Sequence, residues 1–174
     1  MKTKLTATLN AILLLAAPLS NFAADQPWFR RSLVGLEVGP TGAQFGHSDT
    51  NDTRYGAHFD GREIALATKD CHAEYLVIWA RDGDWVYYDS KLQPKCPGLG
   101  NRDVLREAVA EGHKLGLPII AYCQMQYPGQ TLREHPDWRA VDKGGKPIDG
   151  RVCYRTGYRE FMKQMLSEQL AYGI

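Results

Sequence analysis

Charged and aromatic residues directly follow an apolar run in the stretch YLVIWARDGDWVYYDSKLQPK, residues 75–95. The first five residues are largely of the aromatic and β-branched types that buried strands favour. Trp79 closes this run, and Arg81, Asp82 and Trp85 follow it. Aromatic rings suit the apolar faces of sugars, while guanidinium and carboxylate groups can bond to sugar hydroxyls. The combination therefore indicates a carbohydrate pocket where this strand ends.

Two other apolar runs lead into residues of the same kinds. Glu37 lies in VGLEVGP, and Tyr122 and Gln124 lie at the end of PIIAYCQ. In parallel α/β architectures the loops at the carboxyl ends of the strands converge on one cavity, so we expect these residues to share the pocket. The predicted substrate-binding residues are Glu37, Trp79, Arg81, Asp82, Trp85, Tyr122 and Gln124.

Glycoside hydrolysis usually requires two carboxyl groups, about 5 Å apart for retention or about 6.5–9.5 Å apart for inversion. Glu37 and Asp82 are candidates for one of them, and the sequence offers no convincing pair. Both also have structural interpretations: Glu37 as a buried carboxylate bonded to backbone amides, and Asp82 as part of a turn with Asp84. Arg81 has the alternative role of pairing with either carboxylate, and Trp79 that of filling a barrel interior.

Three amphipathic helical patterns alternate with the apolar runs. The first starts at Asp60, with Glu63 three residues later as in a capping box. Its periodicity places Ile64, Ala67 and Cys71 toward the core. Cys71 is therefore predicted to be a buried thiol.

The second pattern begins near Asn101 or Asp103 and ends at Gly116, and the third runs from about Tyr158 to Gly173. Methionines at helical spacing in the third indicate core packing and not a cofactor site. The residues predicted to face the core are Leu105, Val109, Gly112 and Leu115 in the second helix, and Phe161, Met162, Met165, Leu166 and Leu170 in the third.

Strand starts near residues 32, 75, 118 and 174 alternate with these helices, which indicates a parallel sheet covered by helices. A (β/α) barrel and a doubly wound open sheet both have this order. GPTGAQFG, residues 39–46, lacks the GxGxxG spacing of a dinucleotide site and leads into a long loop. Since a complete barrel needs about 250 residues, we expect an α/β fold, a partial (β/α)8 TIM barrel of about three βα units truncated before strand 4.

The first residues are typical of an export signal. Two lysines precede the apolar run AILLLAAPL, and Ala23 and Ala24 follow it. The run is too short to span a membrane in the mature protein. We therefore predict a signal peptide at residues 1–24, the barrel domain at residues 25–174, a secreted or periplasmic location and no membrane partner after cleavage.

Composition argues against several classes of partner. The chain has 21 Lys and Arg against 20 Asp and Glu, so its net charge of +1 favours no nucleic acid. The cysteines form no CxxC pair and no metal spacing with histidine, so neither a metal nor a cofactor is expected. Three disulfide pairings remain open among Cys71, Cys96, Cys123 and Cys153.

Four strings, in this order, resemble a group of bacterial secreted proteins classed as hypothetical glycoside hydrolases, which are distantly related to the α-L-fucosidase (β/α)8 barrels. The strings are VGLEVGPTGAQFG, EYLVIWARDGDWVYYDSK, GLGNRDVLREAVAEGHKLGLPIIAYCQ and EHPDW. The resemblance covers nearly all of the chain after the predicted signal peptide. It implies a glycoside hydrolase that cleaves O-glycosidic bonds of an oligo- or polysaccharide through carboxylates.

The chain departs from the fucosidases at the expected site. Those enzymes have a histidine pair where Arg81 and Asp82 stand, and a strand-one histidine about where Glu37 stands. Their nucleophilic aspartate belongs to the end of the fourth strand, which implies a nucleophile beyond Ile174 and an inactive fragment. Two alternatives stay open: a non-catalytic carbohydrate-binding or degenerate barrel protein, and an unstable gene fragment.

Overall fold

The computed structural model describes residues 26–40 and 53–174, and the chain divides into two compact units, residues 1–31 and 32–174. In the first unit, helix α2 (Trp28–Arg31) is a single turn in which the Trp28 and Phe29 rings meet edge to face. The predicted signal peptide lies outside the described residues, as do residues 41–46 of the GPTGAQFG segment. No helix in the described ranges is long and apolar enough to cross a membrane.

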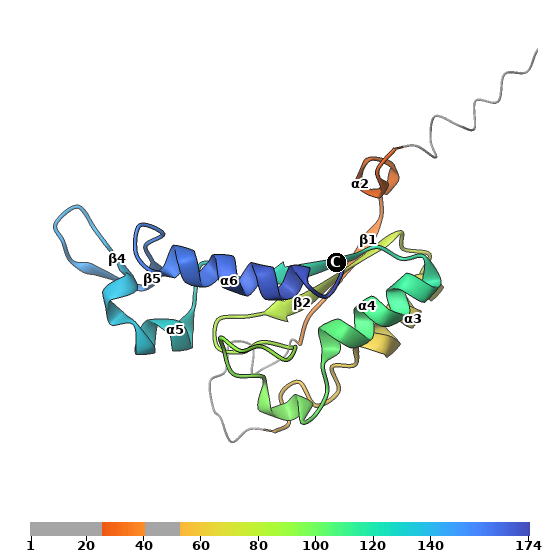
Figure 1. Ribbon diagram of the computed structural model, residues 1–174, viewed down its shortest axis with the longest axis horizontal. Helices are drawn as coiled ribbons and strands as arrows, with labels where there is room; N and C mark the ends of the chain where they lie inside the picture. Colours follow the sequence, from red (N-terminus) through yellow and green to blue (C-terminus); the bar gives the residue numbers. More distant parts are fainter. Residues whose placement is uncertain (1–25, 41–52) are drawn as a thin grey trace, which may run out of the picture. The chain divides into compact units, whose positions relative to one another are not determined.

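The second unit is built on a parallel sheet with the strand order β1–β2–β3 (Figure 1). Gly35 pairs with Tyr75, and Leu76 pairs with Ile119. The predicted α/β class with a parallel sheet is therefore confirmed. The strands are β1 (Gly35–Val38), β2 (Tyr75–Arg81) and β3 (Ile119–Cys123).

The two faces of the sheet differ in burial. Leu76, Ile78 and Ala80 of β2 are fully buried, whereas Val77 and Trp79 between them are only partly buried. This alternation follows from the opposite directions of successive side chains in a strand. One face thus forms the core, and the other remains accessible.

Helices α3 (Gly61–Asp70) and α4 (Val104–Leu115) lie side by side and both pack on β2 (Figure 1). The predicted N-cap of α3 is confirmed, because Asp60 accepts from the Glu63 amide. Of the two starts predicted for α4, Asp103 is the one observed, and it caps the helix by accepting from the Arg106 amide. Gly116 ends α4 in the left-handed conformation, with φ of 63°, which glycine adopts without strain.

The predicted inward face of α3 is confirmed for Ile64, which packs against the core, and is wrong for Ala67 and Cys71, which are exposed. Its buried residues are Gly61, Ala65 and Thr68, while Cys71 is the exposed C-cap. The cause is the approach of α4, because a Cβ at Gly61 would clash with the Val104 carbonyl oxygen. The residues four and seven positions after Gly61 share its side of the helix and are buried with it.

The predicted inward face of α6 (Tyr158–Leu170) is also confirmed only in part: Met162 and Met165 are buried, and Phe161 is partly buried against the core. Its buried residues are Tyr158, Met162, Met165 and Gln169, and the large exposed ones are Leu166 and Leu170. The contact that sets this stripe lies far away in the sequence: the Tyr88 hydroxyl is 2.7 Å from the Met165 sulfur.

The segment between β3 and α6, residues 124–157, contains a short helix, a 3₁₀ turn and two strands. An antiparallel hairpin within it projects beyond the parallel sheet (Figure 1). Its elements are α5 (Gly129–Glu134), a 3₁₀ turn (Pro136–Trp138), β4 (Arg139–Val141) and β5 (Pro147–Val152).

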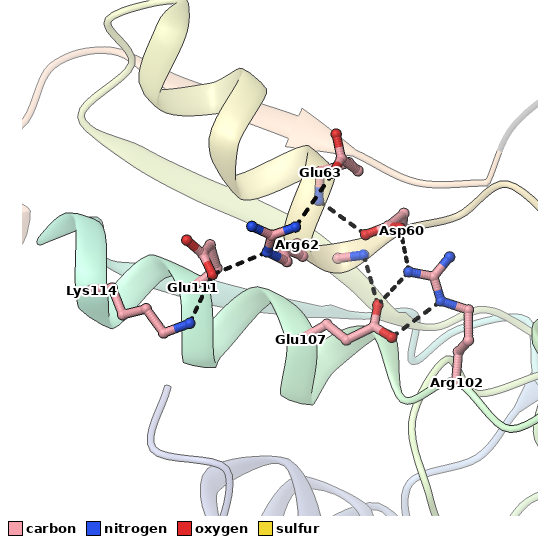
Figure 2. A network of polar contacts seen from close by, with 8 residues as sticks. Asp60, Arg62, Glu63, Arg102, Glu107, Glu111 and Lys114 are labelled. Carbon is pink, nitrogen blue, oxygen red and sulfur yellow. Dashed lines mark hydrogen bonds and ion pairs between the residues drawn. The ribbon is translucent and has the colours of Figure 1, made fainter.

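A polar network joins the amino-terminal ends of α3 and α4 (Figure 2). Glu107 accepts from the Gly61 amide at 3.1 Å and from the Arg102 guanidinium at 2.9 Å, and Arg102 also pairs with Asp60. Burial opposes ionisation of Asp60, but the Glu63 amide and Arg102 outweigh it and lower the pKa of this carboxyl. The ionised form of Asp60 therefore stabilises the folded state.

We predict that Asp60→Asn lowers the free energy of unfolding by about 0.5–1 kcal/mol at pH 7, since it removes a partly exposed charge pair but keeps a good N-cap. A carboxyl with a lowered folded-state pKa stabilises the fold above its unfolded pKa, and this contribution is lost as the pH falls below about 4. Urea unfolding at pH 7 and pH 3 measures both effects. The deficit should be smaller at pH 3 than at pH 7, and an equal deficit at the two pH values would contradict the explanation. Asp70→Asn, at the other end of α3, is the control.

Candidate functional site

Three of the predicted site residues meet on the sheet face opposite α3 and α4. The Trp79 indole nitrogen donates to the Glu37 carboxylate at 3.0 Å. Trp79 also stacks on Tyr122, with ring centroids 4.5 Å apart and planes 22° apart. Glu37 is exposed, and the two rings are partly buried. One accessible carboxylate beside two stacked rings is an arrangement suited to a sugar, with its hydroxyls and apolar ring face.

Glycine residues of β1 and its end make room for these rings. A Cβ at Gly39 would lie 2.6 Å from atoms of the Trp79 ring, and one at Gly35 would clash with the Tyr75 ring. The two glycines of VGLEVGP therefore mark the position of the site, although the spacing of apolar residues does not reveal it. They let bulky rings of β2 lie across β1, beside Glu37.

Asp82 lies in a different environment and is only 1% exposed. One carboxylate oxygen accepts from the amides of Asp84 and Trp85, at 2.8 and 2.7 Å. The other accepts from the Tyr87 hydroxyl and lies 3.5 Å from the Tyr55 hydroxyl. These partners occupy the carboxylate, which favours the turn-forming interpretation of Asp82 over a catalytic one.

The tyrosines around Asp82 extend this cluster to the end of β1. The Tyr55 hydroxyl lies 3.2 Å from that of Tyr87 and donates to the Pro40 carbonyl at 2.9 Å. Burial raises the pKa of Tyr55 to about 12, and burial together with the Asp82 charge raises the pKa of Tyr87 further. Both phenols therefore stay protonated at neutral pH and serve as hydrogen-bond donors.

Arg81 is fully buried and joins β2 to β3. Its Nε donates to the Gln93 side chain at 2.7 Å, and its Nη1 donates to the Gln124 carbonyl. In the ranges that the structure describes, it pairs with neither Asp82 nor Glu37, and its Nη2 has no hydrogen-bond partner. The guanidinium therefore fastens the ends of two strands and one loop, away from the Glu37 face.

Two groups close to Arg81, the Cys123 thiol and the Tyr158 phenol, are neutral. Burial raises the pKa of Cys123, and it raises that of Tyr158 to about 12, although the Arg81 charge opposes both shifts. Neither group therefore supplies a negative charge near neutral pH. None of the four cysteines, all of which lie in the described residues, forms a disulfide.

Residues around Gly83 tie the β2 loop to the segment after β3. A Cβ at Gly83 would clash with the Tyr127 carbonyl oxygen. Asp84 pairs with Arg133 of α5 at 2.8 Å. Trp85 is buried in the hydrophobic core. These residues thus shape and fasten the loop, and the ring of Trp85 lies in the core.

The structure therefore divides the predicted site into an accessible part and a buried part. The accessible part consists of Glu37, Trp79 and Tyr122. The buried part consists of Arg81, Asp82 and Trp85, and the Gln124 carbonyl accepts a hydrogen bond from Arg81. No cluster of three or more metal-binding side chains occurs in the described ranges 26–40 and 53–174.

Comparison with known proteins gives one family. Residues 60–172, well over half of the chain, match the family model described as hypothetical glycosyl hydrolase 6. No curated protein sequence matches the chain significantly.

Solved structures with a similar fold are α-L-fucosidases. Isoenzyme 2 from Paenibacillus thiaminolyticus has 17% identity and a TM-score of 0.58 over 75% of this chain and 20% of its own. AlfC from Lactobacillus casei has 16% identity and a TM-score of 0.57 over 84% of this chain and 56% of its own. Isoenzyme 1 from P. thiaminolyticus has 20% identity and a TM-score of 0.54 over 84% of this chain and 40% of its own.

These likenesses show a shared fold. The chain spans between a fifth and just over half of the length of the three enzymes.

We predict that Tyr87→Phe lowers the free energy of unfolding by about 1–3 kcal/mol, because it removes a hydroxyl donor from the buried Asp82 carboxylate. Tyr122→Phe is a matched control, since that partly buried hydroxyl has no hydrogen-bond partner among the described residues and its loss should cost less than about 0.5 kcal/mol. Chemical denaturation of both variants measures the difference. Equal losses would show that the Asp82 cluster does not hold this loop.

Proposed function

This chain belongs to the hypothetical glycosyl hydrolase 6 family, and we propose that it forms the first part of a (β/α)8 barrel that hydrolyses O-glycosidic bonds in an oligo- or polysaccharide. The observation that carries this proposal is the grouping of Glu37, Trp79 and Tyr122, one residue from each parallel strand, on the face opposite the helices. In a barrel that face is the interior, and active sites lie at the carboxyl ends of the strands.

The open edges of the sheet support the barrel. Among the described strands, β1 and β3 each pair on one side only, which leaves backbone donors and acceptors free to bond further strands. The similar structures are longer than this chain. We therefore propose that further strands of the whole protein extend the sheet and enclose the Glu37 face.

Glu37 is the proposed acid or base. Its carboxylate is accessible and is oriented by the Trp79 indole, so it can exchange a proton with a substrate or bond to its hydroxyls. Hydrolysis needs a second carboxyl group across the scissile bond. We propose that this group, the nucleophile in a retaining reaction, comes from the rest of the barrel, so that the chain of 174 residues is inactive alone.

The proposed location is outside the cytoplasm. Lys2, Lys4 and the apolar run after them support export. An exported enzyme would meet polysaccharides that do not enter the cell.

We predict that Glu37→Gln in the full-length protein lowers kcat about 10²–10⁴-fold, since it removes a proton-transfer group but keeps an oxygen that accepts from Trp79. Trp79→Ala should mainly raise KM, about tenfold, through loss of the stacking surface. Release of 4-nitrophenol from a panel of glycosides, and of reducing ends from oligosaccharides, measures both.

Asp70→Asn, at the carboxyl-terminal end of α3, is the control and should stay within twofold of the wild type. Full activity of Glu37→Gln would refute its proposed role. Binding of oligosaccharides by the wild type without any release of reducing ends would support a carbohydrate-binding protein instead.

A further inference from the structure

The segment between β3 and α6 carries an exposed aromatic patch. Tyr127 is 45% exposed, Tyr154 is 41% exposed and Met125 is 36% exposed. In the described part of residues 32–174, these two tyrosines are the exposed aromatic side chains. Single exposed apolar residues are ordinary, but two rings that gather around one short stretch call for an explanation.

Both rings are held in place by the surrounding chain. The Tyr154 hydroxyl donates to the Met125 carbonyl at 2.9 Å, and its ring packs 5.4 Å from that of Tyr158. The Arg151 guanidinium lies over the Tyr127 ring, 4.3 Å from its centroid. Rings fixed before binding lose little conformational entropy when a ligand stacks on them. The patch is therefore preorganised for a flat apolar surface.

The patch is attached to the loops that follow β2 and β3. The Tyr127 carbonyl packs on Gly83 of the β2 loop. Three residues before Tyr127, the Gln124 carbonyl accepts a hydrogen bond from the buried Arg81 guanidinium. The five-residue separation of Tyr127 from Tyr122 also limits the distance between their Cα atoms to about 18 Å. A chain-like ligand on the stacked pair of Trp79 and Tyr122 could thus extend to Tyr127.

The chemistry of the patch suits a carbohydrate better than a polyanion. The hairpin, residues 139–152, carries the four basic residues Arg139, Lys143, Lys146 and Arg151 and the two acidic residues Asp142 and Asp149. This small excess of two charges, in a chain whose net charge is +1, does not make the extended basic surface that a nucleic acid requires. Two apolar ring faces and the donors of Arg151 match the apolar faces and hydroxyls of sugar rings.

We propose that Tyr127, Arg151 and Tyr154 form a second carbohydrate subsite, which binds sugar units of an oligosaccharide other than the unit held at Trp79 and Tyr122. This subsite rests on the proposed function. It favours extended substrates over single sugars, because a monosaccharide derivative bound at Glu37 does not reach it.

The test compares two substrates of the full-length protein. The first is the 4-nitrophenyl monoglycoside that is hydrolysed fastest in a panel of hexosides, pentosides and deoxyhexosides, and the second is a tetrasaccharide with the same terminal sugar. We expect the double substitution Tyr127→Ala and Tyr154→Ala to raise KM for the tetrasaccharide about tenfold, as the loss of about 1.4 kcal/mol of binding free energy requires. The kcat/KM for the monoglycoside should stay within twofold.

Two further variants separate stacking from structural damage. Tyr127→Phe keeps the ring and should retain the tetrasaccharide KM within about threefold. Leu170→Ala removes an apolar side chain that is even more exposed, at 64%, but lies on α6, and should leave the KM for both substrates unchanged. An unchanged tetrasaccharide KM in the double variant, or equal losses on both substrates, would overturn the proposed subsite.

The proposed hydrolase activity and the proposed subsite can be disproved independently of each other. If no glycoside in the panel is hydrolysed, the proposed activity is wrong, and calorimetric titration with tetrasaccharides that end in each sugar of the panel then tests the subsite alone. At least tenfold weaker binding by the double variant would support the subsite, and equal binding would overturn it.

Discussion

Parallel pairing of the three strands determines where every candidate side chain lies. Val77 faces Glu37 in the register, and Trp79 faces Tyr122, so Glu37, Trp79 and Tyr122 share one face of the sheet. A slip of one residue would turn a strand's whole set of side chains to the other face. The register is held from the far side, where the buried residues of β2 pack against α3 and α4. The geometry of the accessible site therefore depends on packing at the other face of the sheet.

Burial separates the charged residues into two groups with different consequences. Asp82 and Arg81 are enclosed and bonded to protein groups, so they stabilise the loops that follow β2 and β3. Glu37 is exposed, and its carboxylate accepts a hydrogen bond from the neutral indole of Trp79. A buried and saturated carboxylate is poorly placed to exchange protons with a substrate, whereas an exposed one can do so. The proposed chemistry accordingly lies on β1.

Local patterns in the sequence predicted the three parallel strands and the N-cap of α3, because an apolar run and a capping residue such as Asp60 depend on residues close in the chain. They did not predict the hairpin strands β4 and β5. They failed where the outcome depends on distant partners. The buried face of α3 follows from the contact of Gly61 with α4, and that of α6 from Tyr88. For the same reason the sequence grouped Trp85 with Trp79, although core packing buries only one of the two rings completely.

The central claim is that Trp79 and Tyr122 form a sugar-binding surface beside Glu37. A crystal structure of the full-length protein with the terminal monosaccharide of its substrate tests this most directly. Our account predicts a sugar ring stacked on Trp79 or Tyr122, with a hydroxyl or the glycosidic oxygen within hydrogen-bond distance of Glu37. Side chains of the remaining barrel packed against Trp79, with the sugar bound elsewhere, would contradict it.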